Sequence, residues 1–275
     1  FLFFFYSFLI VLSTIGYGFI FKKIFLKNNL YLNLSLIGFF GLLTLYIISS
    51  ITHIFLPHNF FHNILLHLIG ILSIFYFKNK ISKSDLKIIL IIFTSLFLGY
   101  IISKTNEDFP YYHLPMSLQI AQQKLQFGTG NINIAYNHFS SLFHINSLFY
   151  LPGIKFYLFN LTNYLFQIFF FSGLIILLKE KKNPDLVIIL VGLTLIVFLS
   201  KFNRLSEYGA DIAGQLLALY SFIFCLIAYF GKKILPKENL FYLIEISFYF
   251  SIFAVTTKIL YVIYFILPLI ISFRI

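Results

Sequence analysis

Long apolar runs dominate this sequence and constrain its fold more than any other feature. A helix needs about 20 predominantly apolar residues to cross the hydrocarbon core of a bilayer. Only 11% of the residues are charged, whereas a soluble domain carries about 25%. The apolar runs lie near residues 1–21, 31–55, 59–77, 86–103, 154–178, 185–200, 210–230, 239–256 and 259–275. The sequence therefore predicts an all-α, polytopic transmembrane helical bundle of about nine spans, and it excludes a soluble protein.

Basic residues gather in every second connection between these runs. In a soluble protein, the net charge of +11 would suggest binding to nucleic acid. Here the basic residues lie in the connections between apolar runs, so we expect no nucleic-acid partner. Lys and Arg accumulate on the cytoplasmic side of membranes. We therefore expect a multi-pass protein of the inner (cytoplasmic) membrane, with the 104–153 segment, the 201–209 segment and Lys258 at the extracytoplasmic face. The basic connections contain Lys22, Lys23 and Lys27; Lys78, Lys80, Lys83 and Lys87; Lys179, Lys181 and Lys182; and Lys232, Lys233 and Lys237.

The 104–153 segment is the longest polar stretch, and its pattern predicts two interfacial helices. Apolar residues recur at helical spacing from Leu114 to Leu125, with glutamines on the opposite face. This pattern is typical of an amphipathic helix that lies on the membrane surface. A break is expected at 127–131, and a second interfacial helix from His138 to Tyr150.

The acidic residues are few enough to be interpreted one by one. Glu107 and Asp108 open the 104–153 segment, and the Phe109-Pro110 pair that follows restricts the backbone there. A carboxylate held in this way at a membrane face suits a general base, and Asp108 is the better candidate; the alternative is an exposed loop acid. Four other acids lie beside the basic connections and are interpreted as solvated loop charges: Asp85, Glu180, Asp185 and Glu238.

A second polar stretch covers residues 201–211. With a helix beginning near Leu205, the carboxylates of Glu207 and Asp211 share one ridge, which we expect to face into the bundle. Two carboxylates at this spacing repel each other unless a cation lies between them, and Arg204 or a divalent metal would supply it. The alternative interpretation is a structural ion pair at the start of a helix.

Lys258 and a group of histidines are further polar residues expected near the outer face. Lys258 has no charged neighbour in the sequence, so it either snorkels to the surface or binds an anionic ligand, and we leave both open. His58 and His62 have the i, i+4 spacing that suits zinc. No carboxylate or Cys lies close to them in the sequence, so we favour interfacial histidines without a metal.

Three stretches of the chain resemble the GT-C glycosyltransferases, integral membrane enzymes that use polyprenyl-phosphate sugars at the extracytoplasmic face. The stretches are Glu107-Asp108-Phe109-Pro110-Tyr111-Tyr112-His113-Leu114-Pro115, Arg204 through Asp211, and Thr256-Thr257-Lys258. GT-C enzymes carry an acidic residue, as base or metal ligand, in their first large extracytoplasmic loop, and Asp108 stands in that place. The family's acid usually follows the first span, whereas three further spans precede it here.

The resemblance implies transfer of a sugar from a polyprenyl-phosphate donor to an envelope glycan, lipid or protein acceptor. It gives catalytic roles to Asp108 and Glu107. If the reaction uses a divalent metal, Mg or Mn, the resemblance implies that Asp108 and Asp211 hold it. It gives substrate-binding roles to His113, Arg204, Glu207, Asp211 and Lys258. Residues 1–275 would form a single integral membrane domain, a fragment of a longer protein, in which 86–275 is the GT-C-like core.

Two other functions stay open at this point. A transporter or a flippase of lipid-linked glycans would use the same charges as a pathway, but the sequence has no inverted repeat and no matching pair of broken spans. A non-catalytic subunit of envelope assembly would tolerate substitution of all of its extracytoplasmic acids.

Overall fold

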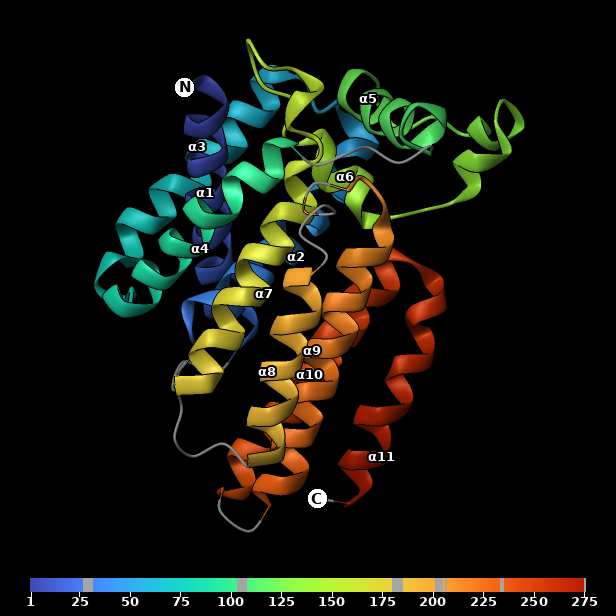
Figure 1. Ribbon diagram of the computed structural model, residues 1–275. Coiled ribbons are helices and arrows are strands. Elements are labelled where there is room, and N and C mark those ends of the chain that lie inside the picture. Colours follow the sequence, from blue (N-terminus) through green and yellow to red (C-terminus); the bar gives the residue numbers. More distant parts are fainter. Residues whose placement is uncertain are drawn as a thin grey trace. The chain divides into compact units, whose positions relative to one another are not determined.

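The computed structural model describes residues 1–26, 32–102, 108–179, 185–200, 205, 207–232 and 235–274. Within these ranges the chain is helical and contains no β-strand, which confirms the all-α prediction (Figure 1). Seven of the described helices are long and apolar enough to cross a membrane. They are α1 (Leu2–Phe25), α2 (Leu34–Phe55), α3 (Phe60–Phe77), α4 (Lys83–Ile102), α7 (Leu161–Lys179), α9 (Ala210–Gly231) and α10 (Lys237–Thr257).

The two remaining predicted spans are shorter than the other seven. Helix α8 (Asp185–Ser200) has 16 residues and coincides with the predicted run 185–200. The last run divides into a 3₁₀ helix, η7 (Ile259–Phe265), and the α-helix α11 (Ile266–Arg274). The predicted run at 154–178 also begins later, because a turn with Gly153 at φ 79° and the short 3₁₀ helix η5 (Phe156–Leu158) precede α7.

The chain divides into two compact units, each with its own packing. Unit 1 comprises Phe1–Phe169 with Asn203–Gly209, and unit 2 comprises Phe170–Phe202 with Ala210–Ile275. Unit 1 contains α1 to α6 and the first part of α7. Unit 2 contains the rest of α7, then α8, α9, α10, η7 and α11.

Small residues bring the helices of unit 1 into close contact. A Cβ atom placed on Gly16 of α1 would overlap the Gly70 carbonyl group of α3, and one on Gly41 of α2 would overlap the Thr14 carbonyl group of α1. Lipid offers no hydrophobic drive for helix association, so close van der Waals packing at small residues has to supply it. Tyr17 of α1 adds a polar contact by donating its hydroxyl to the Leu66 carbonyl at 2.8 Å.

Unit 2 packs α9 against α10 through hydroxyl groups as well as through a glycine. Ser221 of α9 lies 2.7 Å from the Ser247 hydroxyl and 2.8 Å from the Ser251 hydroxyl, both on α10. A Cβ on Gly214 of α9 would overlap the ring of Tyr261 in η7 and would lie 2.7 Å from the Thr257 hydroxyl oxygen of α10. Buried serine contacts of this kind hold helices together where no water competes for the hydrogen bonds.

Asp85 is not the solvated loop charge that the sequence predicted. The residue is 5% exposed, and its Oδ2 accepts the Leu34 backbone N–H at 3.1 Å. The first N–H groups of a helix have no partner within the helix, and a carboxylate there also meets the positive end of the helix dipole. Asp85, from the first turn of α4, thus satisfies the start of α2 across 51 residues of sequence.

Residues 108–160 fold into a cap at one end of unit 1, hereafter called the outer cap after the side of the membrane that the sequence predicts for it. It holds α5 (Leu114–Gln122) and α6 (Ser141–Ser147), both shorter than the sequence pattern predicted. The backbone turns extended at Gln123, which ends α5 before Leu125, and the Ser140 side chain accepts the Leu142 N–H to begin α6. Helix α5 packs on α6, and α6 packs on α2 (Figure 1).

The predicted break between the two cap helices is confirmed. Gly128 has a φ of 77°, in the left-handed region that glycine adopts without steric cost. The short 3₁₀ helices η3 (Thr129–Asn131) and η4 (Ile134–Asn137) follow it.

Replacing Gly16 by Ala should destabilise the protein by about 3 kcal/mol, at the upper end of overpacking costs, because the overlapping partner is backbone and cannot rotate away. The measurement is reversible unfolding in detergent. Gly192→Ala is the matched control, since a Cβ on this helical glycine of α8 would meet nothing within 4 Å. It should be neutral or stabilising by up to about 1 kcal/mol, and equal losses in the two variants would contradict the packing account.

Candidate functional site

Asp108 lies exposed where the outer cap begins. It precedes the single π-helical turn η2 (Phe109–His113), which contains Pro110 and leads directly into α5. Within the described part of the chain its carboxylate makes no hydrogen bond or ion pair. A single π-turn of this kind is often found at functional sites. The carboxylate is therefore available to a proton donor or a cation from solution.

The described residues of the second polar stretch that belong to unit 1, Leu205 and Glu207–Gly209, contact α7. The Asn163 side-chain amide of α7 donates to the carbonyl oxygens of Glu207 and Gly209, the latter at 2.8 Å. Gln167, one turn further along α7, donates to the Leu205 carbonyl at 3.0 Å. These amides satisfy backbone groups that have no helical partner.

Two aromatic rings join this stretch to the start of the outer cap. The rings of Phe109 and Tyr208 have centroids 4.0 Å apart, and Tyr208 is 5% exposed in a small core with Ala121 and Phe159. Phe109 follows Asp108, and Tyr208 follows Glu207. The two acid-bearing stretches that the sequence singled out thus meet within unit 1.

The prediction that Glu207 and Asp211 lie on one ridge of the same helix is wrong. Helix α9 begins at Ala210 rather than near Leu205, because the Asn163 amide holds the preceding carbonyl groups in a non-helical segment. Glu207 is half-buried in that segment, and Asp211 lies exposed in the first turn of α9. The expectation that this ridge faces into the bundle is also wrong, since Asp211 and Gln215 are exposed while the small residues beside them, Gly214 and Ala218, are buried.

In unit 2 the cation beside Asp211 is Lys258. Its Nζ lies 2.6 Å from Asp211 Oδ1, with side-chain exposures of 44% for Lys258 and 59% for Asp211. Tyr261 donates its hydroxyl to the Asp211 backbone carbonyl at 3.0 Å, which fixes the first turn of α9. A pair this exposed contributes only about 0–1 kcal/mol, so an external anion could displace the carboxylate from the ammonium group.

His113 is placed differently from its sequence neighbour Asp108. Its side chain is 3% exposed and packs beside the rings of Tyr112 and Phe143, with centroids 4.2 and 5.5 Å away. It lies inside the outer cap, whereas Asp108 faces solvent.

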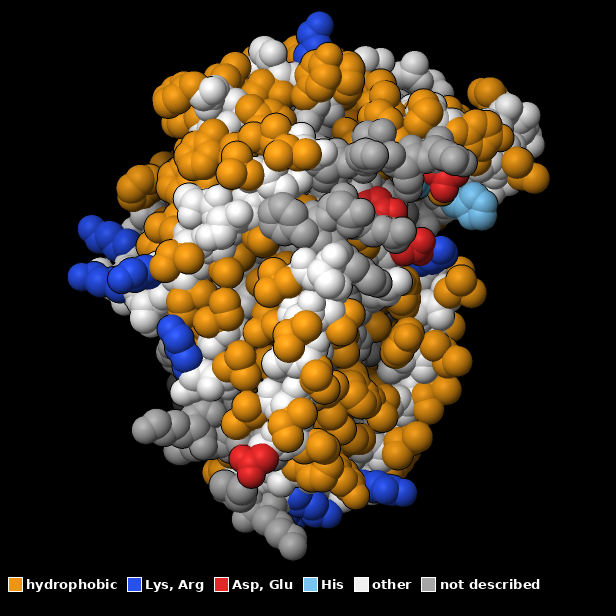
Figure 2. Space-filling model, in the orientation of Figure 1, with side chains coloured by type: hydrophobic (Ala, Val, Ile, Leu, Met, Phe, Trp, Pro, Cys, Tyr) orange, Lys and Arg blue, Asp and Glu red, His pale blue; other side chains and the backbone are white. Residues whose placement is uncertain are grey.

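Two of the predicted site residues, Glu107 and Arg204, lie outside the described residues. Among the residues that are described, no group of three or more His, Cys, Asp or Glu side chains is arranged to hold a metal ion. Hydrophobic side chains cover most of the face seen in Figure 2, and acidic side chains are few on it.

A histidine network that sequence reasoning did not assemble anchors the outer cap. His58, in the turn between α2 and α3, lies 2.7 Å from the Ser147 hydroxyl of α6 through its Nδ1 and 3.1 Å from the Thr52 hydroxyl through its Nε2. The Ser49 hydroxyl donates to the His144 carbonyl at 2.9 Å. The sequence does show several histidines within residues 53–67 and two more within 138–144, but no feature of it indicates that these two segments contact each other.

Asn63 closes the same network from α3. Its amide donates to the carbonyl groups of His58 at 2.8 Å, Ser147 at 2.8 Å and Tyr150 at 3.0 Å, and its side chain is fully buried. The backbone of α5 is tied to the same place, because the His58 N–H donates to the Ile120 carbonyl at 3.1 Å. The outer cap is therefore fixed to the ends of α2 and α3 by buried hydrogen bonds.

Burial keeps the histidines of this network neutral. It lowers the pKa of His58 to about 2, and the nearby imidazoles of His62, His53 and His144 add to the shift. Burial likewise lowers the pKa of His144 to about 4, with a further contribution from His53. Both values lie below the ordinary histidine pKa of about 6.5, so the folded protein resists protonation at these two sites.

The protein should lose stability as the pH falls below about 6.5. The unfolded chain then binds a proton at His58 that the folded state excludes, and this costs about 2 kcal/mol at pH 5 relative to pH 7.5. The measurement is unfolding in detergent from pH 8 to pH 5. His58→Gln should reduce the pH dependence, with the contribution of His144 remaining, whereas the control His138→Gln, at an exposed position, should leave it unchanged. A slope that is the same in all three proteins would contradict this account.

Comparison with known proteins identifies the family and nothing finer. No curated protein matches the chain, and no solved structure matches it. One family model matches, over residues 1–275, and its description is "Domain of unknown function (DUF8201)". Since the match covers the whole sequence, the chain belongs to the DUF8201 family.

Proposed function

We propose that this protein is a membrane glycosyltransferase of GT-C type, which moves a sugar from a polyprenyl-phosphate donor to an extracytoplasmic envelope acceptor. The observation that carries the proposal is the exposed carboxylate of Asp108 at the start of a firmly anchored polar cap. The proposal includes the nine-span topology and the placement of the outer cap outside the inner membrane, as the alternation of basic connections predicts.

Asp108 is proposed as the general base. Its carboxylate takes the proton of an acceptor hydroxyl, and the hydroxyl oxygen forms a bond to the anomeric carbon of the sugar. The bond between that carbon and the phosphate oxygen breaks, and its electron pair leaves with the polyprenyl phosphate. The exposed position of Asp108 and the absence of a partner among the described residues support this role. Glu107 is proposed as its catalytic neighbour.

Lys258 is proposed to bind the phosphate of the donor. Negative charge grows on the phosphate as the sugar leaves, and a fixed cation there stabilises the transition state more than the ground state. The contact with Asp211 holds the ammonium group in place while the donor is absent. Arg204 is proposed to act on the same phosphate, because a guanidinium binds phosphate in bidentate fashion.

The other predicted substrate-binding residues take supporting roles in the proposal. Glu207 and Asp211 would orient the cations, and His113, packed inside the outer cap, would shape the acceptor site from behind rather than touch the phosphate. A Mg or Mn ion at Asp108 or Asp211 remains part of the proposal, with the exposed oxygens of these two carboxylates as hard ligands.

The test follows donor consumption in the purified full-length protein in detergent, mixed with polyprenyl-phosphate sugars and an envelope extract. Mass spectrometry measures the intact donor. Asp108→Asn should lower turnover at least roughly 100-fold, the usual contribution of a general base, while leaving thermal unfolding unchanged. The matched control is Asp185→Asn, which makes the same substitution at an exposed aspartate in the first turn of α8, and it should retain full turnover.

A fully active Asp108→Asn protein would contradict the proposed base. A donor that stays intact with every protein but co-purifies with the wild type would point to a transporter or flippase. A donor that neither reacts nor binds would favour the non-catalytic subunit.

A further inference from the structure

An apolar groove lies between α1 and α3 in unit 1, at the end of these helices opposite the outer cap. Its volume is about 610 Å³, and it is lined by Ile20, Lys23, Ile24, Ile69, Leu72, Ser73, Tyr76 and Phe77. The outer cap lies at the other end, because Gly153 of the cap sits beside Leu2 at the start of α1. The groove is therefore at the end where α1 and α3 finish.

The groove opens toward the surroundings rather than into the core. Ile24 is 65% exposed, Leu72 64% and Tyr76 73%. Its lining residues carry two hydroxyl groups, on Ser73 and Tyr76, and the Ser73 hydroxyl donates to the Ile69 carbonyl at 2.8 Å. Most of the lining residues are apolar, with Lys23 and Tyr76 as the large polar ones, and this apolar surface suits a hydrocarbon chain.

The length of the groove fits one leaflet of a bilayer. From Ile69 to Phe77, α3 rises roughly 12 Å at 1.5 Å per residue. Half of the hydrocarbon core measures about 15 Å. An acyl chain of the adjacent leaflet could therefore lie along the groove for most of its depth.

Lysines surround the polar end of the groove. Lys23 Nζ lies 5.3 Å from the centre of the Tyr76 ring, and Lys80 Nζ lies 5.7 Å from the centre of the Phe77 ring. These cation–π contacts keep both ammonium groups beside the groove. Lys22 is close enough to Lys80 for their charges to repel, so the two helix ends concentrate positive charge at one place.

No described carboxylate of unit 1 balances this charge. The described acids of unit 1 are Asp85, Asp108 and Glu207. Asp85 is buried and bonded to the start of α2, and the other two belong to the outer cap and the stretch against it. Among the described residues of unit 1, no carboxylate therefore lies at this cationic end of the apolar groove.

We propose that this groove binds an anionic phospholipid of the cytoplasmic leaflet, with its phosphate at Lys23 and Lys80 and one acyl chain between α1 and α3. The inference is independent of the proposed glycosyltransferase activity. It commits to a membrane lipid, because a free phosphate would use the lysines but leave the apolar groove empty.

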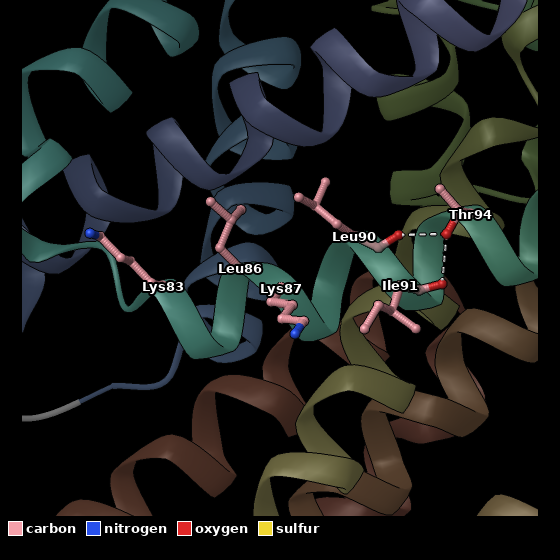
Figure 3. A pocket seen from close by; sticks show the side chains of 6 residues that line it. All are labelled: Lys83, Leu86, Lys87, Leu90, Ile91 and Thr94. Atoms are coloured by element: carbon pink, nitrogen blue, oxygen red, sulfur yellow. Dashed lines mark hydrogen bonds between the residues drawn. The ribbon is translucent and has the colours of Figure 1, made fainter.

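A second groove, along α4, lacks two features of the groove between α1 and α3: an aromatic ring and a second helix. It is smaller, about 360 Å³, and is lined by Lys83, Leu86, Lys87, Leu90, Ile91 and Thr94. Figure 3 shows Leu86 and Leu90 projecting from one side of α4, with the Thr94 hydroxyl bonded back to the Leu90 and Ile91 carbonyl groups. No aromatic ring lines this groove and its residues come from one helix, so the proposal is restricted to the groove between α1 and α3.

The test is native mass spectrometry of the purified protein in detergent, titrated with phosphatidylglycerol and with phosphatidylcholine of the same acyl chains. The variant Lys23→Gln/Lys80→Gln removes the two cations beside the groove. The control Lys124→Gln/Lys155→Gln removes two exposed lysines of the outer cap, with the same change in net charge. A third variant, Leu72→Trp, fills the groove and keeps the lysines.

Wild type and control should bind phosphatidylglycerol equally and in preference to phosphatidylcholine. Lys23→Gln/Lys80→Gln should weaken phosphatidylglycerol binding roughly 30-fold, from about 1 kcal/mol for each lysine near a phosphate. Leu72→Trp should also weaken it, whereas a lysine site for free phosphate would not respond to this substitution. Equal losses in the two double variants, or equal binding of the two lipids by the wild type, would overturn the proposal.

Discussion

The bilayer interior imposes one requirement on which the rest of this structure depends: every buried backbone polar group needs a partner within the protein. Helices meet the requirement along their length but leave their ends open. This chain closes the open ends with side chains from distant segments. Asp85 accepts a hydrogen bond from the start of α2, and the Asn163 amide donates to carbonyl groups of the non-helical segment before α9. These polar contacts act together with the close packing at small residues to fix which segments meet.

The same requirement explains why the polar segment after α4 is ordered around the turn between α2 and α3. Asn63 meets three carbonyl groups there, and neutral His58 joins α6 through Ser147. A firmly held outer cap can present Asp108 in a constant position, as a general base requires. At the other end of unit 1, exposed isoleucine and leucine side chains lie beside lysines, where we propose that a lipid binds. The two ends of this unit are thus suited to different chemistry.

Much of the fold follows from local patterns in the sequence. Apolar run length predicted the helices, and Gly128 marked the break between the two cap helices. The sequence also singled out the two acid-bearing stretches that meet through Phe109 and Tyr208. It could not place the start of α9, because a side chain from α7 decides where that helix begins. Nor could it reveal that Asp85 is buried, since the partner N–H lies 51 residues away.

The placement of the two ends of unit 1 on opposite sides of the membrane is the claim that both proposals share. It is tested most directly by labelling single cysteines with a membrane-impermeant maleimide in intact cells, on a Cys225→Ser background. Lys124→Cys, on the outer cap, should react in intact cells. Lys80→Cys, beside the lipid groove, should react only after the membrane is permeabilised. Labelling of both positions in intact cells, or of Lys80→Cys alone, would contradict the account.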